Sequence, residues 1–216
     1  MTGQEVAWTL GRVYMGWPTR AVSKARAYGR DRVPAEGGAV YAINHLHWLD
    51  VPLVGALSPR DVDFVAKVEV AKLPVLSEFL LWHGTILVRR GASDRDAVRQ
   101  MRQAAHDGHV VGLFVEGTRQ SHGRPGTAQP GAAMVASQED VPVIPIAVYG
   151  TQFWKPTDFA PCSIAFGEPV RFEGLPKGGK GYKEATVEIE RRINVLFDWL
   201  ADVHARGRPR DEVPPL

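Results

Sequence analysis

Residues 39–52 read Ala-Val-Tyr-Ala-Ile-Asn-His-Leu-His-Trp-Leu-Asp-Val-Pro, and this stretch decides the fold. Its first five residues are all apolar or aromatic, which predicts a strand that is buried on both faces. The residues that follow bring two histidines and an aspartate directly beyond the strand end. A buried strand that leads into titratable groups is typical of α/β folds, which place functional sites at the carboxyl ends of parallel strands.

Short apolar runs and helical patterns alternate along the rest of the chain. This alternation predicts a single α/β domain with a central, mostly parallel sheet flanked by helices. The expected strands are residues 39–43, 63–66, 85–88, 110–115, 143–149 and 163–166. A capping pattern at Ser93 and Asp96 opens a helix that stops at Gly108. An apolar stripe over residues 189–203 predicts a long amphipathic helix near the end of the chain.

The composition indicates one globular domain, because 216 residues with 44% hydrophobic and 23% charged side chains can bury a substantial core. We expect residues 35–205 to form this domain and residues 206–216, which are proline-rich and charged, to be a disordered tail. The formal net charge of +2 argues against a nucleic-acid partner. The single cysteine, Cys162, excludes an internal disulfide and a cysteine-built metal site, and it favours a reducing compartment such as the cytoplasm.

Residues 1–34 form an amphipathic N-terminal segment. Residues 6–17 are mostly apolar, but Arg12 interrupts them and they are too few to span a bilayer, which takes about 20 residues. On a helix, one side would gather Val6, Leu10, Val13, Tyr14 and Trp17, and basic residues follow. Such a helix can lie in the headgroup region of a membrane. A helix that packs on the core would show the same pattern, so both interpretations stay open.

His45 and Asp50 are the candidate catalytic pair. On a regular helix they would point about 140° apart, so the chain must bend between them if the side chains are to meet. Asn44 as a helix N-cap and Pro52 in the first turn would provide such an entry. A carboxylate that holds an imidazole fixes its tautomer, and the other ring nitrogen then acts as a general base. A capped helix with satisfied polar groups is the structural alternative.

The base has no protein nucleophile beside it in the sequence. No serine or cysteine lies in a G-x-S-x-G turn, so the activated hydroxyl would belong to a substrate. A metal site is the main rival, since His45 and His47 followed by Asp50 look like the metal-binding run of metallo-β-lactamase-type hydrolases. In that run the aspartate comes two residues after the second histidine and another histidine follows it, whereas here Asp50 comes three residues after His47 and Val51 follows. We therefore expect no metal and no cofactor.

Two further polar clusters follow other expected strands. Residues 114–119, Phe-Val-Glu-Gly-Thr-Arg, combine a glycine, a hydroxyl and an arginine, and Arg124 lies in the glycine-rich stretch beyond them. Arg89 and Arg90 follow the strand at 85–88. Glycine lets a backbone approach a ligand, and arginine binds phosphate with two parallel hydrogen bonds. The clusters predict an anion-binding side of the site, although turns with surface charges would look similar.

Taken in order, these clusters resemble the glycerolipid acyltransferase family, which includes bacterial 1-acylglycerol-3-phosphate acyltransferases. Four blocks carry the resemblance: N-H-x-x-x-x-D at residues 44–50, a block close to G-x-x-F-I-x-R at 84–90, F-P-E-G-T-R at 114–119 and V-P-V-I-P at 141–145. Three positions depart from the family pattern. Val115 replaces a proline, His47 replaces a common serine and Leu87 replaces an aromatic residue, and none of these removes a group that the chemistry needs.

The resemblance implies an O-acyltransferase that moves a fatty acyl group from acyl-CoA or acyl carrier protein to the free hydroxyl of 1-acylglycerol-3-phosphate, giving phosphatidic acid in phospholipid biosynthesis. It makes His45 the base and Asp50 its partner, and backbone amides near Gly117 would stabilise the oxyanion. The implied substrate-binding residues are Lys67, Arg89, Arg90, Glu116, Gly117, Thr118 and Arg119.

A lysolipid substrate further implies contact with a membrane surface, by a peripheral (monotopic) protein on the cytoplasmic side of the cell membrane. Other acceptors remain open, namely glycerol-3-phosphate or another lipid hydroxyl. A metal-dependent hydrolase and a non-catalytic lipid-binding protein are the alternatives from other classes.

Overall fold

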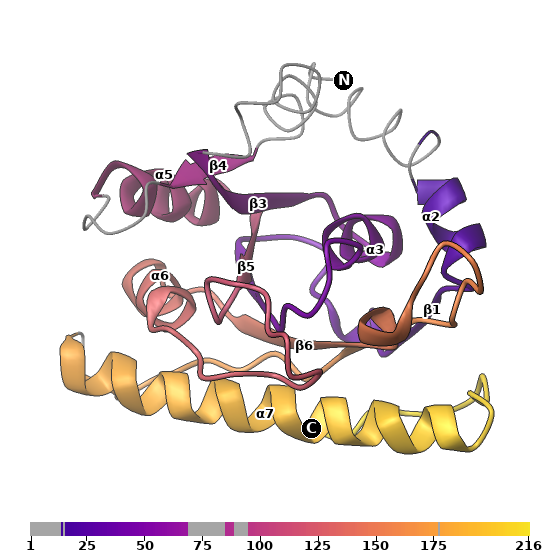
Figure 1. Cartoon of the computed structure of the whole chain (residues 1–216). Coiled ribbons are helices and arrows are strands. Elements are labelled where there is room, and N and C mark those ends of the chain that lie inside the picture. Colours follow the sequence, from indigo (N-terminus) through magenta and orange to yellow (C-terminus); the bar gives the residue numbers. More distant parts are fainter. Residues whose placement is uncertain (1–13, 15, 69–84, 89–94, 177) are drawn as a thin grey trace.

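The computed structural model describes residues 14, 16–68, 85–88, 95–176 and 178–216. Their helices and strands are α2 (Trp17–Val22), β1 (Arg26–Tyr28), η2 (Arg30–Arg32), β2 (Ala39–Ile43), α3 (Asp50–Leu57), β3 (Val62–Lys67), β4 (Ile86–Val88), α5 (Arg95–His106), β5 (Val110–Phe114), α6 (Gly131–Glu139), β6 (Val143–Tyr149), η4 (Thr151–Phe153), β7 (Ser163–Phe166) and α7 (Gly179–Ala205). Figure 1 shows them as one α/β domain, which confirms the predicted fold class.

The strands form one seven-stranded sheet in the order β1-β7-β6-β2-β5-β3-β4. Strands β6, β2, β5, β3 and β4 are parallel to one another. Strand β7 is antiparallel to β6, and β1 is parallel to β7. All six expected strands are present. The sequence did not reveal β1, because Arg-Ala-Tyr is too short and too polar to stand out as a buried strand.

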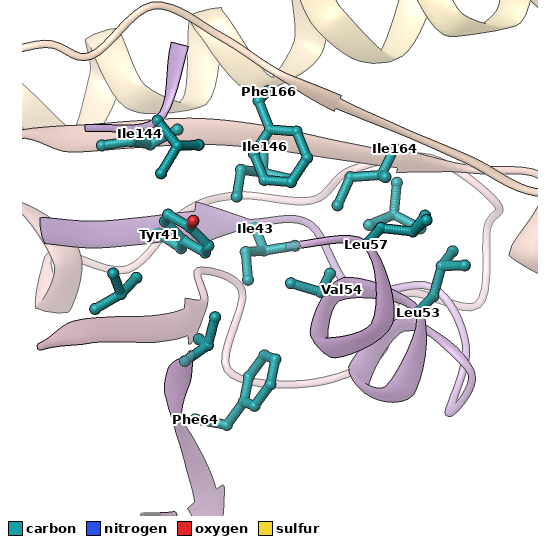
Figure 2. Close-up of a cluster of buried hydrophobic side chains, with 14 of the residues drawn as sticks. Tyr41, Ile43, Leu53, Val54, Leu57, Phe64, Ile144, Ile146, Ile164 and Phe166 are labelled. Atoms are coloured by element: carbon teal, nitrogen blue, oxygen red, sulfur yellow. The ribbon is translucent and has the colours of Figure 1, made fainter. Parts of the chain in front are cut away.

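Helices cover both faces of the sheet (Figure 1). Tyr41 and Ile43 of β2 belong to the cluster that includes Leu53 and other residues of α3, and Figure 2 shows these side chains meeting between the sheet and α3. The alternate residues Val40 and Ala42 belong to the cluster that includes residues of α5, α6 and α7. Because neighbouring residues of a strand face opposite sides, a central strand covered on both faces is apolar throughout, as β2 is.

Residues 206–216 differ from the expectation of disorder, because they lie against the body of the domain. The Arg32 guanidinium donates to the carbonyl oxygens of Pro214 at 2.6 Å and Leu216 at 3.1 Å. The Glu168 amide also donates to the Leu216 oxygen, at 2.6 Å. The proline-rich and charged composition concealed this, since the tail is held by polar contacts with distant parts of the chain. Besides the bonds from Arg32, the Arg208 guanidinium of the tail donates to the Lys24 and Cys162 carbonyls at 2.7 and 2.9 Å.

The predicted N-terminal helix lies largely outside the described residues. Within them, α2 begins at Trp17, whose side chain is 74% exposed, as Tyr14 is at 73%. Strand β1 belongs to the segment 1–34 but pairs with β7, so this segment contributes directly to the sheet. Among the helices that the structure describes, none is both long and apolar enough to cross a membrane.

Candidate active site

The register of β2 and β5 brings two of the sequence clusters together. The last pair of this parallel ladder joins Ile43 to Phe114. His45 and Glu116 each follow two residues later, so both leave the sheet at the same edge. The Val115 amide donates to the Ile43 carbonyl at 2.9 Å and continues the pairing by one bond. Residues 71 positions apart in the chain thus form one candidate site.

Asn44 ties the same edge to β6. Its side chain is fully buried, and its amide group donates to the Val148 carbonyl at 3.1 Å and accepts from the Val148 N–H at 2.7 Å. A carboxamide has a donor and an acceptor, so it reproduces a backbone pair just beyond the strand. The expectation that Asn44 caps a helix was wrong, because α3 begins at Asp50 with Leu49 at its N-cap.

His45 and Asp50 meet, as the predicted bend requires. The His45 Nδ1 atom lies 2.8 Å from Asp50 Oδ2. The same oxygen accepts the N–H groups of Leu46 and His47, each at 2.7 Å, and these bonds fold the loop back onto the start of α3. Since a carboxylate oxygen accepts, Nδ1 carries the proton and Nε2 keeps a free lone pair. The Asp50 side chain is fully buried, whereas that of His45 is 16% exposed and reaches the surface of the site.

Phe114 orients the His45 ring, a role that sequence reasoning missed. The two ring centroids lie 4.2 Å apart and the planes are inclined by 30°. Phe64 stacks on Phe114 in turn, with centroids 6.1 Å apart. No pattern in the sequence revealed this contact, because it depends on the register that pairs Phe114 with Ile43, next to the loop that carries His45.

Glu116 lies beneath this loop and is only 7% exposed. Its Oε2 atom accepts the His45 backbone N–H at 3.0 Å, and its Oε1 atom accepts the Gly126 N–H at 3.3 Å. Burial raises the pKa of Glu116 to about 7; its hydrogen bonds from backbone N–H groups oppose this, and the charge of Asp50 adds to it. The sequence predicted that Glu116 binds substrate, but both of its carboxylate oxygens accept hydrogen bonds from backbone N–H groups.

The remainder of the 114–119 cluster forms an exposed turn. Gly117 has φ 67°, a left-handed conformation that favours glycine, and its N–H donates to the Phe114 carbonyl at 3.0 Å. That amide is therefore occupied within the turn. Thr118 and Arg119 are exposed, and no described residue forms a hydrogen bond or ion pair with the Arg119 guanidinium. Arg124, in contrast, forms an ion pair with Asp198 at 2.6 Å.

His47 lies close to Arg119. Burial lowers the pKa of His47, and the positive charges of Arg119 and His45 add to this while Asp50 opposes it. The His47 Nδ1 atom accepts the Leu49 N–H at 3.4 Å. In the part of the chain that the structure describes, no group of three or more histidine, cysteine, aspartate or glutamate side chains could hold a metal ion.

Three predicted binding residues are not placed by the structure. Arg89 and Arg90 lie outside the described residues. Lys67 is the last residue of β3, where its backbone pairs with Val88, but its side chain is outside the description.

A histidine–carboxylate pair at the carboxyl edge of a mostly parallel sheet is an arrangement typical of the active sites of α/β enzymes. A family model described as Acyltransferase matches residues 24–149, which is more than half of the chain. The chain belongs to this acyltransferase family.

Individual relatives agree with the family. The chain is 28% identical over 176 residues to a 1-acyl-sn-glycerol-3-phosphate acyltransferase of Bacillus subtilis, covering 79% of this chain and 87% of that protein. It is 34% identical over 93 residues to a lyso-ornithine lipid O-acyltransferase of Pseudomonas aeruginosa, covering 39% of this chain and 35% of that one. The crystal structure of the acyltransferase PlsC from Thermotoga maritima superposes with a TM-score of 0.73 at 22% identity, covering 94% and 80% of the two chains, and shows the same fold.

The raised pKa of Glu116 predicts a pH-dependent contribution to stability. Because the folded state binds this proton more tightly than the unfolded chain, which titrates near 4.5, the contribution is full below pH 4.5 and is lost as pH rises to about 7. The loss is about 3 kcal/mol. Glu116→Gln cannot titrate, so the wild-type-minus-variant difference in unfolding free energy, measured in urea, should fall over this range. If the difference in unfolding free energy between wild type and Glu116→Gln stays constant from pH 4.5 to about 8, the pKa of Glu116 is not raised and the prediction fails.

Proposed function

We propose that this acyltransferase moves a fatty acyl group from acyl-CoA or acyl carrier protein to the free hydroxyl of 1-acylglycerol-3-phosphate, giving phosphatidic acid. The observation that carries the proposal is the His45–Asp50 pair, with Nδ1 and Oδ2 2.8 Å apart and Nε2 left free. The Bacillus relative, a 1-acyl-sn-glycerol-3-phosphate acyltransferase that matches along 79% of this chain, supports this choice of acceptor.

The proposed reaction needs no covalent acyl-enzyme. His45 Nε2 takes the proton of the acceptor hydroxyl, and the oxygen attacks the thioester carbonyl carbon. The new C–O bond forms, the C–S bond breaks, and the proton held by His45 passes to the leaving thiolate. Asp50 stabilises the imidazolium that forms between the two proton transfers, as the carboxylate of a catalytic triad does.

Arg119 is the proposed contact for the acceptor phosphate. Its side chain is exposed and has no partner among the described residues. Its positive charge contributes to the lowered pKa of His47, which lies two residues from the proposed base. Lys67, Arg89, Arg90, Gly117 and Thr118 remain proposed substrate-binding residues on the resemblance alone. A second acceptor class, a lysolipid without phosphate, is favoured by the 34% identity to the lyso-ornithine lipid O-acyltransferase.

We also propose that the protein binds the cytoplasmic surface of the cell membrane as a peripheral protein. Four rings beside the site form an aromatic rim, consisting of His47, Trp48, Trp154 and Phe159. Trp48 and Phe159 are 53% and 40% exposed, and each contacts Trp154, with centroids 5.7 and 6.1 Å apart. The Trp154 Nε1–H group donates a hydrogen bond to the Val22 carbonyl at 2.9 Å, which fixes this ring.

Such a rim suits a lipid surface. Rings that combine an apolar body with a polar edge prefer the headgroup region of a bilayer. The adjacent segment supports this, because the exposed Tyr14 and Trp17 precede Arg20, Lys24 and Arg26 with no acidic residue between them. Cations at this position attract anionic lipids.

The base is tested by His45→Ala, with Asp50→Asn as a second variant. Loss of the base should lower the rate of thiol release from acyl-CoA in the presence of 1-acylglycerol-3-phosphate by about 10²–10⁴-fold. The wild type should be assayed with both thioester donors against 1-acylglycerol-3-phosphate, glycerol-3-phosphate and lyso-ornithine lipid. Near-wild-type turnover by His45→Ala would contradict the mechanism. Loss of activity on adding a chelator would point to a metal-dependent hydrolase, and lipid binding without thiol release to a non-catalytic lipid-binding protein.

Arg119→Ala tests recognition of the phosphate. Loss of a charge-assisted contact should raise the KM for 1-acylglycerol-3-phosphate by about 10–100-fold and change kcat much less. The KM for lyso-ornithine lipid, measured in the same variant, serves as the control because this acceptor has no phosphate. An equal change of KM for both acceptors would show that Arg119 does not read the phosphate.

The aromatic rim is tested with the double variant Trp48→Ala and Phe159→Ala. Removal of both exposed rings should weaken binding to sedimented phosphatidylglycerol-containing vesicles by about tenfold. Val187→Ala is the control, because Val187 is also an exposed apolar residue, at 63%, but lies on α7 and outside the rim. Unchanged binding of the double variant would exclude the rim as the membrane contact.

A further inference from the structure

We infer that Glu116 is a positioning residue, which holds the backbone of His45 in place and does not contact the acceptor. The sequence pattern assigned this carboxylate to substrate binding. Its position in the structure instead assigns it to the support of the His45 backbone. The inference deepens the proposed function, because it concerns the base on which that function rests.

The peptide groups on both sides of the His45 Cα atom are held by one turn. The His45 N–H donates to Glu116 Oε2 at 3.0 Å, and the His45 carbonyl accepts the Gln120 N–H at 2.8 Å. Both partners come from residues 116–120, which directly follow β5. The backbone of the base is therefore fixed to the neighbouring strand, independently of the bond between its ring and Asp50.

The second oxygen of Glu116 extends this connection. Oε1 accepts the Gly126 N–H at 3.3 Å, so one carboxylate joins the catalytic loop, the end of β5 and the far side of the glycine-rich loop. Glutamate suits this position because each of its two oxygens can accept one N–H, and both bonds are stronger when the group is ionised. Glutamine has the same length, but its NH₂ group would face one of the two N–H donors.

The burial of Glu116 argues against a contact with the acceptor. The residue is 7% exposed and both oxygens are occupied, whereas Thr118 and Arg119 in the same turn are exposed. If the negatively charged Glu116 lay against the phosphate of the acceptor, the two groups would also repel each other. The turn thus presents its arginine outward and its glutamate inward.

The position of the reacting nitrogen depends on this arrangement. Asp50 holds the His45 Nδ1 atom, Phe114 stacks against the ring, and Glu116 sets the backbone from which the ring projects. If one of these restraints is removed, Nε2 shifts relative to the hydroxyl it must deprotonate. A displacement of about 1 Å lowers the rate by about 10²-fold without a change in binding contacts.

The experiment compares Glu116→Gln and Glu116→Asp with the matched control Glu190→Gln. Glu190 Oε2 accepts the Ala128 N–H at 2.8 Å, so it holds a nearby loop position by the same chemistry but forms no bond with His45. For each protein we would measure kcat and the KM for 1-acylglycerol-3-phosphate. Hydrogen exchange of the assigned His45 amide by NMR gives a readout that needs no turnover.

Both Glu116 variants should lose about 10²-fold in kcat, with the KM for the acceptor changed by about twofold or less. The His45 amide should exchange at least about tenfold faster in both than in the wild type, and Glu190→Gln should leave both quantities unchanged. The Asp variant keeps the charge but shortens the reach, so wild-type kcat in that variant would show that charge alone matters and would overturn the inference.

An increase in KM at unchanged kcat would also overturn it, by showing that Glu116 binds the acceptor. Fast exchange of the His45 amide in the wild type would overturn it without any variant, which covers the case that a substitution prevents folding. If the wild type releases no thiol with any acceptor, the proposed function fails. The exchange comparison would still decide the role of Glu116.

Discussion

The candidate site depends on one constraint, the position and register of β2 between β5 and β6. Because Ile43 pairs with Phe114 on one side and with Ile146 on the other, the residues that follow β2 emerge with a neighbouring strand on each flank. Each flank then supplies a backbone anchor. Asn44 is tied to Val148 of β6, and His45 is tied to the turn that follows β5. A slip of one residue in either ladder would separate these partners and expose buried side chains to solvent.

The electrostatics of the site follow from the number of ionisable side chains that meet at this edge of the sheet. Two buried carboxylates, Asp50 and Glu116, lie near one histidine, and burial together with the charge of Asp50 raises the pKa of Glu116. Backbone N–H groups bind both carboxylates, two of them at Asp50 Oδ2 and one at each oxygen of Glu116, and at Glu116 they oppose the rise in pKa. In the proposed mechanism, an imidazolium that forms at His45 would be stabilised by the charge of Asp50. The cation Arg119, on the outer side of the turn, remains available for an anionic ligand.

The sequence predicted the parts of this structure that repeat a local pattern. The six apolar strands and the bend between His45 and Asp50 could be predicted, because burial and side-chain chemistry are visible residue by residue. Two features of the site could not be predicted: the stacking of Phe114 on His45 and the inward direction of Glu116. Both depend on which strands are neighbours, and contacts between residues far apart in the chain leave no periodicity behind. The packed tail was missed for a similar reason, because Arg32 binds its carbonyl groups and its own Arg208 donates to carbonyl groups far away in the chain.

The register also accounts for a departure from the family pattern. The F-P-E-G-T-R block has a proline where this chain has Val115, and proline has no backbone N–H. Here the Val115 N–H donates to the Ile43 carbonyl at 2.9 Å, and the Val115 carbonyl accepts the Gln129 N–H at 2.8 Å. Its side chain is 5% exposed and packs in the core on the α5, α6 and α7 face of the sheet. The valine therefore lengthens the β2–β5 pairing by one hydrogen bond, immediately before the turn that holds His45. The substitution changes how the turn is attached to the sheet, while Glu116 and Arg119 keep opposite directions on that turn.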